Sequence, residues 1–374
     1  MKIRTEQLEI PQGRRLLVTS DIHGHISLLQ RLLERAAFSD GDMLFILGDI
    51  IEKGPQSLET LRFVMRLAEQ ENVTVLMGNV DLSRVQMLEN LSEESCGEFY
   101  DLVLMMREWK GTGIYDEMAA ELGIRLDSPG RALECKARLL AAFEKELDFI
   151  RSLPAVVETR NFIFVHAGLP CERLEDVRTR DVYEVLKMDN FMKKGLTFDK
   201  YVVAGHWPVS IYDEKICQMN PVTDREHHII SIDGGCGLHM EGQLNMLILP
   251  EADRGIGGMT HIFCDGYERA VALEDQEGST DSVNIRFSNR RVRVLEEGEE
   301  FSLVEHAASG RRTEILSDRL YNRNGSWADA DGSDYMLPVK AGEELTLVRR
   351  TSRGYVVKKD GICGWYKGEL RNAD

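Results

Sequence analysis

The sequence predicts an α/β fold that begins with a parallel strand, helix, strand, helix, strand arrangement. Between residues 16 and 81, three apolar runs, LLV, MLFIL and VTVLM, alternate with segments in which leucines recur at helical spacing. Strands that alternate with helices are typical of a parallel sheet. Each run ends in a small cluster of Ser, Gly, Asp, His or Asn. Because ligands of open α/β sheets bind beyond the carboxyl ends of the strands, these clusters are the first candidates for a site.

Length, charge and cysteine usage narrow the class of protein. A chain of 374 residues predicts two or three domains. The formal net charge of −17, with no basic run interleaved with aromatics, argues against nucleic-acid binding. The seven cysteines are scattered and never form a CxxC pair, which favours reduced thiols. No apolar leader and no stretch of about 18 apolar residues occurs, so we expect a cytoplasmic protein without a membrane partner.

Residues 90–150 interrupt the alternation of strands and helices. Leucine, methionine and aromatic residues recur there at helical spacing, without any strand signal. We therefore expect an inserted helical lobe. Two interpretations stay open for it: plain packing, or a lid that shapes the access of a substrate.

Strand signals return at FIFV, YVVA, IISI and LNMLIL, and three of these runs end in the polar clusters HAGLP, GHWPV and DGGCG. The chemically versatile side chains that follow apolar runs are Asp21, His23, His25, Asp49, Asn79, Asp81, His166 and His206. Imidazole, carboxylate and amide oxygen together suit Zn²⁺, Fe or Mn²⁺ better than Ca²⁺. This set is too rich for one tetrahedral zinc, and it predicts two divalent transition metals.

The composition changes after Pro250 to charged and Gly-rich segments, and period-two alternation then indicates short strands. We expect a catalytic domain over residues 1–274, with the helical insertion at about 90–150, followed by a β-rich region over 275–374. The last part, about 337–371, has the short strands and Gly-containing turns of a small all-β module.

Five motifs, in order along the chain, resemble those of a known family. They are SDIHG at 20–24, GDIIEKGP at 48–55, GNVD at 78–81, VHAGL at 165–169 and AGHWP at 204–208. The series is similar to the calcineurin-like metallophosphoesterases, in the phosphoprotein-phosphatase branch that includes symmetrical dinucleoside tetraphosphatases and Ser/Thr protein phosphatases. The resemblance implies a β-sandwich flanked by helices, in four αββα layers, with a helical insertion and a small C-terminal all-β module.

The resemblance also implies a division of the ligands between two metals. The first metal would be held by Asp21, His23 and Asp49, and the second by Asn79, His166 and His206, with Asp49 bridging both. Two such metals, roughly 3.5–4 Å apart, share a water, and the resulting hydroxide attacks phosphorus in line. The protein then contributes mainly position and charge.

The chain departs from the family pattern at three positions. Val80 replaces the His that would protonate the leaving oxygen, and Val cannot donate a proton. Glu52 takes the place of the Asp that orients this His, so we expect Glu52 to have lost its partner. Lys53 replaces an Arg, which keeps a positive charge near the phosphate but not the guanidinium fork. His25 is a candidate replacement acid, with a supporting or solvent-facing role as the alternative.

The segment at about 337–371 resembles bacterial Src-homology-three-like modules, through its GEELTLV and DGICGW stretches. Such modules bind peptides or cell-wall components. Packing or homo-oligomerisation ranks ahead of a peptide contact here.

We therefore expect a dinuclear phosphoesterase that hydrolyses phosphate monoesters or phosphoanhydrides, with nucleoside polyphosphates among the candidate substrates. One alternative is a Ser/Thr protein phosphatase, whose substrate is a phosphoprotein. The other is a metal-bound pseudoenzyme that binds a phosphorylated partner. Turnover of an aryl phosphate after loading with Mn²⁺ separates the enzymes from the pseudoenzyme.

Overall fold

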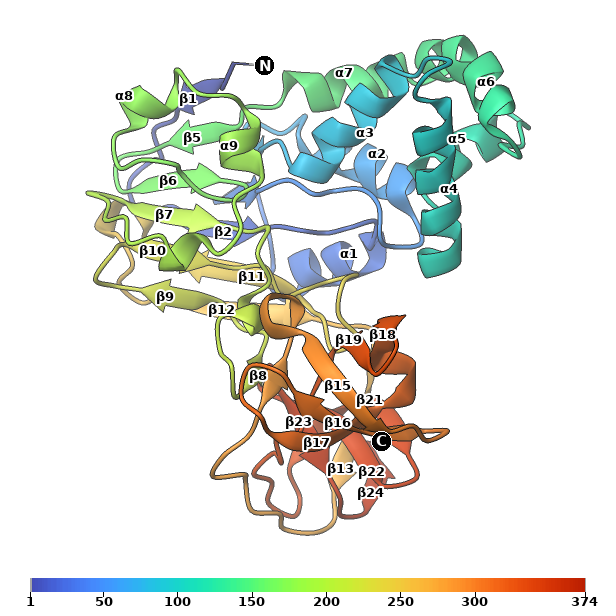
Figure 1. The fold of residues 1–374 in the computed structure, drawn as a ribbon. Coiled ribbons are helices and arrows are strands. Elements are labelled where there is room, and N and C mark those ends of the chain that lie inside the picture. Colours follow the sequence, from blue (N-terminus) through green and yellow to red (C-terminus); the bar gives the residue numbers. More distant parts are fainter. Residues whose placement is uncertain (1, 374) are drawn as a thin grey trace. The chain divides into compact units, whose positions relative to one another are not determined.

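The computed structural model describes residues 2–373, which form two compact units (Figure 1). The first unit takes in the chain up to Trp207 together with Pro221–Asp265. The second unit takes in Pro208–Asn220 and the chain from Gly266 onward. The fold class predicted from the sequence is confirmed, since the chain has mixed α/β structure followed by an all-β region.

The first sheet of unit 1 contains the parallel strands predicted at the start of the chain. Its order is β12, β11, β2, β3, β4, and their bounds are Thr260–Cys264, Leu244–Leu249, Arg15–Thr19, Asp42–Ile46 and Val73–Val75. Strands β2, β3 and β4 run parallel, whereas β11 and β12 join antiparallel. The carboxyl ends of β2, β3 and β4 therefore meet at one edge.

The second sheet of unit 1 is mixed. Its order is β1, β5, β6, β7, β10, β9, with bounds Thr5–Gln7, Val156–Glu158, Phe162–Val165, Tyr201–Ala204, Ile229–Ser231 and Val222–Asp224. Strands β6, β7 and β10 are parallel to one another, so their carboxyl ends also point the same way. These are the strands that precede the HAGLP, GHWPV and DGGCG clusters.

The two sheets share an apolar core, which makes unit 1 a sandwich. Alternate residues of β2, such as Leu16 and Val18, pack with residues of the second sheet in this core. Phe45 from β3 meets Phe164 from β6 with ring centroids 4.3 Å apart. Leu17, between Leu16 and Val18, belongs instead to the core shared with the helices. The period-two pattern of these strands thus serves two buried layers.

Helices cover the outer faces of the sandwich (Figure 1). Helices α1, α2 and α3 are Ile26–Arg35, Ser57–Leu67 and Asn79–Glu89. The insertion contains α4 to α7, at Cys96–Lys110, Ile114–Glu121, Pro129–Ala142 and Glu144–Ser152. Helices α6 and α7 pack on α3. On the second sheet the covering is slighter, because α8 and α9 are single turns at Leu174–Val177 and Tyr183–Leu186.

Unit 2 is built from short strands in two main sheets. One sheet has the order β24, β13, β21, β22, β23, β8, with bounds Leu370–Asn372, Glu268–Ala272, Glu344–Thr351, Gly354–Lys359, Ile362–Tyr366 and Cys217–Gln218. The other has the order β17, β16, β15, β19, β18, with bounds Arg312–Leu316, Phe301–His306, Arg291–Glu296, Trp327–Ala330 and Leu320–Asn324. Strands β14 and β20, Asn284–Ile285 and Gly332–Ser333, pair separately. The resemblance of residues 337–371 to a Src-homology-three-like module stays a prediction.

None of the helices described in residues 2–373 combines the length and apolar character that crossing a membrane requires.

Candidate metal centre

The strand ends of both sheets bring the predicted metal ligands together. Asp21 and His23 follow β2, and Asp49 follows β3. Asn79 is the first residue of α3, after β4. His166 directly follows β6, and His206 follows β7 after one intervening residue. Two groups have ligand atoms within 4.8 Å of one another: Asp21, His23 and Asp49, and Asp49, His166 and His206.

Asp49 belongs to both groups, and its two carboxylate oxygens face different partners. Oδ1 lies 3.4 Å from His166 Nε2, and Oδ2 lies 3.6 Å from His23 Nε2. The backbone N–H of Val80 donates to Oδ1 at 2.9 Å. This hydrogen bond holds the carboxylate between the two groups.

The backbone at the centre adopts left-handed conformations that ordinary residues avoid. Six non-glycine residues there have φ between 49° and 68°: Asp21, His23, Asp49, Glu52, Lys53 and His206. Each costs on the order of 1–3 kcal/mol unless its surroundings hold it in place. The surroundings do so, because the N–H of Asp21 donates to Gly48 O and that of His23 to Asp49 O, both at 3.0 Å. Strain of this kind clusters at functional sites.

Two glycines allow the loops after β3 and β4 to touch. A Cβ on Gly78 would lie 2.0 Å from the backbone nitrogen of Asp49, and one on Gly48 would lie 2.4 Å from that of Gly78. No side chain fits in either space. Gly48 also has a φ of 82°, which favours glycine.

Hydrogen bonds to carbonyl groups set the tautomers of two buried histidines. Nδ1 of His166 is 2.7 Å from Leu47 O, and Nδ1 of His23 is 3.2 Å from Ile51 O. A carbonyl oxygen only accepts, so each Nδ1 carries the proton and each neutral ring presents a lone pair at Nε2. His166 Nε2 lies 2.9 Å from Asn79 Oδ1, which is also an acceptor. The two atoms thus face each other as two ligands of one cation would.

Other features also show that these residues fit divalent metal ions. Oδ1 of Asp21 is buried and accepts no hydrogen bond from any described residue. The ammonium group of Lys53 lies 2.9 Å from His23 Nε2 and 4.0 Å from Asp49 Oδ2, where it stands in for a cation. Carboxylate, imidazole and amide donors match Mn²⁺, Fe or Zn²⁺. The donor set of this centre therefore suits divalent transition metals.

Burial shifts the protonation of the carboxyl and imidazole groups. Burial, and then the charge of Asp49, raises the pKa of Asp21 to about 8. Burial, and then His166, lowers the pKa of His206 to about 3. Burial raises the pKa of Asp49 as well, but His166 and His23 outweigh it and hold that pKa below its usual range. His206 is therefore neutral at pH 7 and free to act as a ligand.

Glu52, whose expected imidazole partner is replaced by Val80, pairs with an arginine instead. Nε of Arg84, on α3, donates to Oε1 of Glu52 at 2.8 Å. The side chain of Glu52 is 1% exposed and that of Arg84 is 14% exposed, so this is an almost buried ion pair. Oε2 of Glu52 accepts no hydrogen bond from a described residue. Arg84 lies one helical turn after Val80 on α3, and no local spacing in the sequence links it to Glu52 in the loop after β3.

The two candidate catalytic residues lie close to the metal ligands. Lys53 Nζ faces His23 and Asp49, as described above. His25 caps α1, and its Nδ1 contacts the carbonyl oxygens of His23 and Ile22 at 2.7 and 3.1 Å. Because Nδ1 donates to these carbonyls, a neutral His25 has no proton at Nε2 to give. Burial lowers the pKa of His25, which disfavours the imidazolium form that could donate one.

Two further carboxylates contribute to the centre. Asp81 accepts the N–H groups of Ile50 and Ile51 through Oδ1, at 2.9 and 3.2 Å, and so shapes the loop after Asp49. Asp233, after β10, is fully buried, and its Oδ2 accepts no hydrogen bond from a described residue. Burial, and then Asp21, raises the pKa of Asp233. Sequence reasoning recognised the DGGCG cluster as a strand end but did not assign Asp233 to the site.

The family model for calcineurin-like phosphoesterases matches residues 14–230 of this chain. The chain belongs to the calcineurin-like phosphoesterase family. The match covers all six predicted ligands and ends within β10. The resemblance of the five motifs to this family is thereby confirmed.

Curated relatives of this phosphoesterase include symmetrical bis(5′-nucleosyl)-tetraphosphatases. The one from Azotobacter vinelandii is 33% identical over 154 residues, which are 37% of this chain and 54% of that protein. The one from Psychromonas ingrahamii is 46% identical over 66 residues, 17% of this chain and 23% of that protein. The chain thus spans about half or less of the length of these relatives. A protein serine/threonine phosphatase structure from Saccharomyces cerevisiae superimposes with a TM-score of 0.42 at 12% identity, covering 71% of this chain and 85% of that one.

Proposed function

We propose that this protein is a dinuclear metal-dependent hydrolase of phosphoanhydrides, with nucleoside polyphosphates as its substrate class. The placement of Asp49 carries the proposal, because one carboxylate presents separate oxygens to two ligand groups. A centre for a single structural zinc does not need such a residue.

Each ligand group has a defined membership. Asp21, His23 and Asp49 would hold one ion, and Asn79, His166 and His206, with Asp49, would hold the other. When bound, the two ions supply Lewis acidity, lower the pKa of a water and neutralise phosphate charge. Burial holds the pKa of His23 and of His206 below the usual value, which favours the neutral form that binds a metal, and the N–H of Val80 aligns Asp49. It also places the cationic Lys53 beside the centre, where a phosphate oxygen needs positive charge.

The lack of a proton donor favours anhydrides over alkyl phosphates. Val80 cannot protonate a leaving oxygen, and Glu52 pairs with Arg84 rather than with an imidazole. An alkoxide such as that of serine needs a proton to leave, whereas a phosphate or nucleotide leaves readily as an anion. The similarity to symmetrical tetraphosphatases supports the same substrate class. A protein serine/threonine phosphatase is therefore the weaker alternative.

The proposal is tested by metal analysis and turnover of the full chain. Protein freed of metal and reloaded with Mn²⁺ should hold close to two ions per chain and hydrolyse an aryl phosphate and a dinucleoside tetraphosphate. Calorimetric titration gives the stoichiometry, and chromatography gives the products. Two bound ions without turnover of either substrate would contradict the proposal and favour a metal-bound pseudoenzyme.

A further inference from the structure

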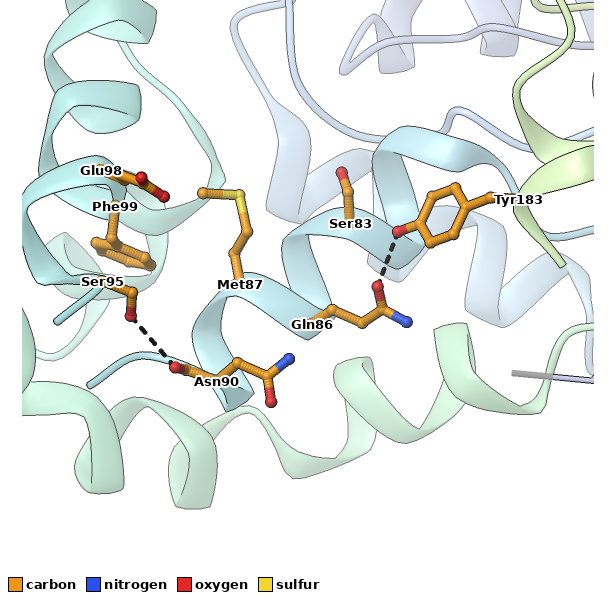
Figure 2. A pocket seen from close by; sticks show the side chains of 8 residues that line it. All are labelled: Ser83, Gln86, Met87, Asn90, Ser95, Glu98, Phe99 and Tyr183. Atoms are coloured by element: carbon orange, nitrogen blue, oxygen red, sulfur yellow. Dashed lines mark hydrogen bonds between the residues drawn. The ribbon is translucent and has the colours of Figure 1, made fainter. Parts of the chain in front are cut away.

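A cavity of about 290 Å³ lies beside α3 in unit 1 (Figure 2). Its walls come from α3, from the start of α4 and from the single turn α9. The lining residues are Ser83, Gln86, Met87, Asn90, Ser95, Glu98, Phe99 and Tyr183. A nucleobase is of a size that such a cavity can hold, since it lies near the lower end of ligand-pocket volumes.

The cavity lies further along the face of α3 that begins with the candidate metal ligand Asn79. Asn79, at the first position of α3, lies on the same helical face as Ser83, Gln86 and Asn90, because these residues are four, seven and eleven positions further on. At 1.5 Å per residue, Gln86 is about 10 Å and Asn90 about 16 Å from Asn79 along the axis. The cavity therefore begins about one turn beyond the candidate metal ligand.

The wall of the cavity opposite α3, formed by α9, is hydrogen-bonded to the loop that carries His166. The N–H of Ala167, next to His166, donates to Val185 O in α9 at 3.1 Å. Tyr183, in the same turn, donates from its hydroxyl to Gln86 Oε1 at 2.8 Å, as Figure 2 shows. The wall opposite α3 is thus anchored at the loop that carries His166.

An arginine side chain of α3 lies beside the cavity. Nη1 of Arg84 lies 3.2 Å from Ser83 Oγ and 3.9 Å from Met87 Sδ, both of which line the cavity. The same guanidinium binds Glu52 through Nε. Arg84 stands at the near end of the cavity, where an anionic chain that leads out of the centre would pass.

Within the cavity the groups suit an uncharged ring with polar edges. The bond from Tyr183 occupies the oxygen of Gln86, which leaves its amide N–H₂ as a donor. The side chains of Asn90 and Glu98 make no hydrogen bond or ion pair to another described residue, so they offer further donors and acceptors. Met87 and Phe99 supply apolar surface. Amide side chains pair with adenine edges, and a carboxylate accepts from an exocyclic amine.

We propose that this cavity binds the nucleobase of a nucleoside polyphosphate whose phosphate chain runs from the metal centre past Arg84. This inference rests on the proposed function, and it adds a binding site for the nucleobase of the substrate. A nucleoside monophosphate is too short, because its phosphorus is attached directly to the sugar, whereas the amide groups lie two to three helical turns from Asn79. Each additional phosphate lengthens the reach. The insertion helix α4 then contributes to substrate selection through Ser95, Glu98 and Phe99.

Matched inhibitors of aryl phosphate turnover test this assignment on the full Mn²⁺-loaded protein. ATP and inorganic tripolyphosphate chelate metal similarly and differ in the nucleoside, and ITP differs from ATP in lacking the exocyclic amine. In wild type, we expect Ki to be lowest for ATP. The preference for ATP over tripolyphosphate should fall about tenfold in Glu98→Ala and Asn90→Phe, the second of which fills the cavity.

Glu94→Ala is the matched control, because Glu94 is exposed on the same segment and does not line the cavity. It should keep the wild-type ratio. Equal Ki values for ATP and tripolyphosphate in wild type, or ratios unchanged in both cavity variants, would overturn the inference. If the aryl phosphate is not hydrolysed at all, the proposed function fails, and calorimetric titration of ATP against tripolyphosphate still decides whether the cavity holds a base.

Discussion

Arg84 Nε donates to Glu52 Oε1 at 2.8 Å, at the position where the family pattern places an acid that orients a catalytic imidazole. The acid here is engaged by a helix residue instead. A single substitution that restores the imidazole would therefore lack its orienting partner.

The first prediction concerns leaving groups. Wild type should hydrolyse aryl phosphates and anhydrides at least about 10² times faster than phosphoserine peptides, since general acid catalysis is worth about 10²–10⁴ in rate. Val80→His alone should not flatten this dependence, because Glu52 stays bound to Arg84. The measurement is kcat/KM across esters of graded leaving-group pKa. Equal rates on phosphoserine and aryl esters in wild type would show that another acid is present.

The second prediction separates the two ligand groups. Asp49→Asn should abolish binding of both ions and nearly all turnover, because Asp49 belongs to both groups. Asp21→Asn and His206→Ala should each lose one ion. Metal content per chain, measured by mass spectrometry after gel filtration, reports the difference. Asp40→Asn, at an exposed position, is the control and should keep both ions. Full metal content in Asp49→Asn would contradict the shared role.

The third prediction concerns the stability of the buried ion pair. Arg84→Ala leaves the Glu52 carboxylate buried without its partner and should lower the free energy of unfolding by about 3–5 kcal/mol. The double variant Arg84→Leu with Glu52→Gln should be less destabilised than Arg84→Ala. Urea denaturation, monitored by circular dichroism, measures both. An unfolding free energy in Arg84→Ala within error of wild type would show that the pair contributes little.

The fourth prediction is that the free energy of unfolding depends on pH through an ion pair at the beginning of β2 and β3. Arg15 of β2 and Asp42 of β3 are register partners, and Arg15 donates from Nε and Nη2 to the two oxygens of Asp42, both at 2.7 Å. Burial raises the pKa of Asp42, but the bonds from Arg15 outweigh it and hold that pKa below its usual value. A depressed pKa stabilises the fold above the unfolded value of about 3.9, and this stabilisation is lost as the pH falls through the folded value.

Asp42→Asn should therefore cost about 1–2 kcal/mol of unfolding free energy at pH 7, discounted because Arg15 is one-third exposed. The difference from wild type should shrink below about pH 4. Urea midpoints measured from pH 3 to pH 8 test it. A gap that stays constant over this range would mean that the ionised form of Asp42 is not what stabilises the fold.

Much of the centre could be predicted from the sequence, because its ligands follow strands whose apolar runs are unmistakable. His166 directly follows β6, whereas Asp21 and Asp49 lie two and three residues after the ends of β2 and β3. Parallel strands bring such ends to one edge. Gly48 and Gly78 indicate the tight turns that allow the loops after β3 and β4 to come into contact. Local pattern and sheet topology were sufficient to place these residues.

Only the tertiary structure decided which side chains from distant elements become partners. The bond from Arg84 to Glu52 joins α3 to the loop after β3, and no local spacing between residues 52 and 84 signals it. The same holds for Asp233, whose closeness to Asp21 depends on how the two sheets stack, and for the cavity between α3, α4 and α9. Strand patterns are repetitive and set by short-range burial, whereas side-chain partners across elements depend on the angles and distances at which whole elements pack.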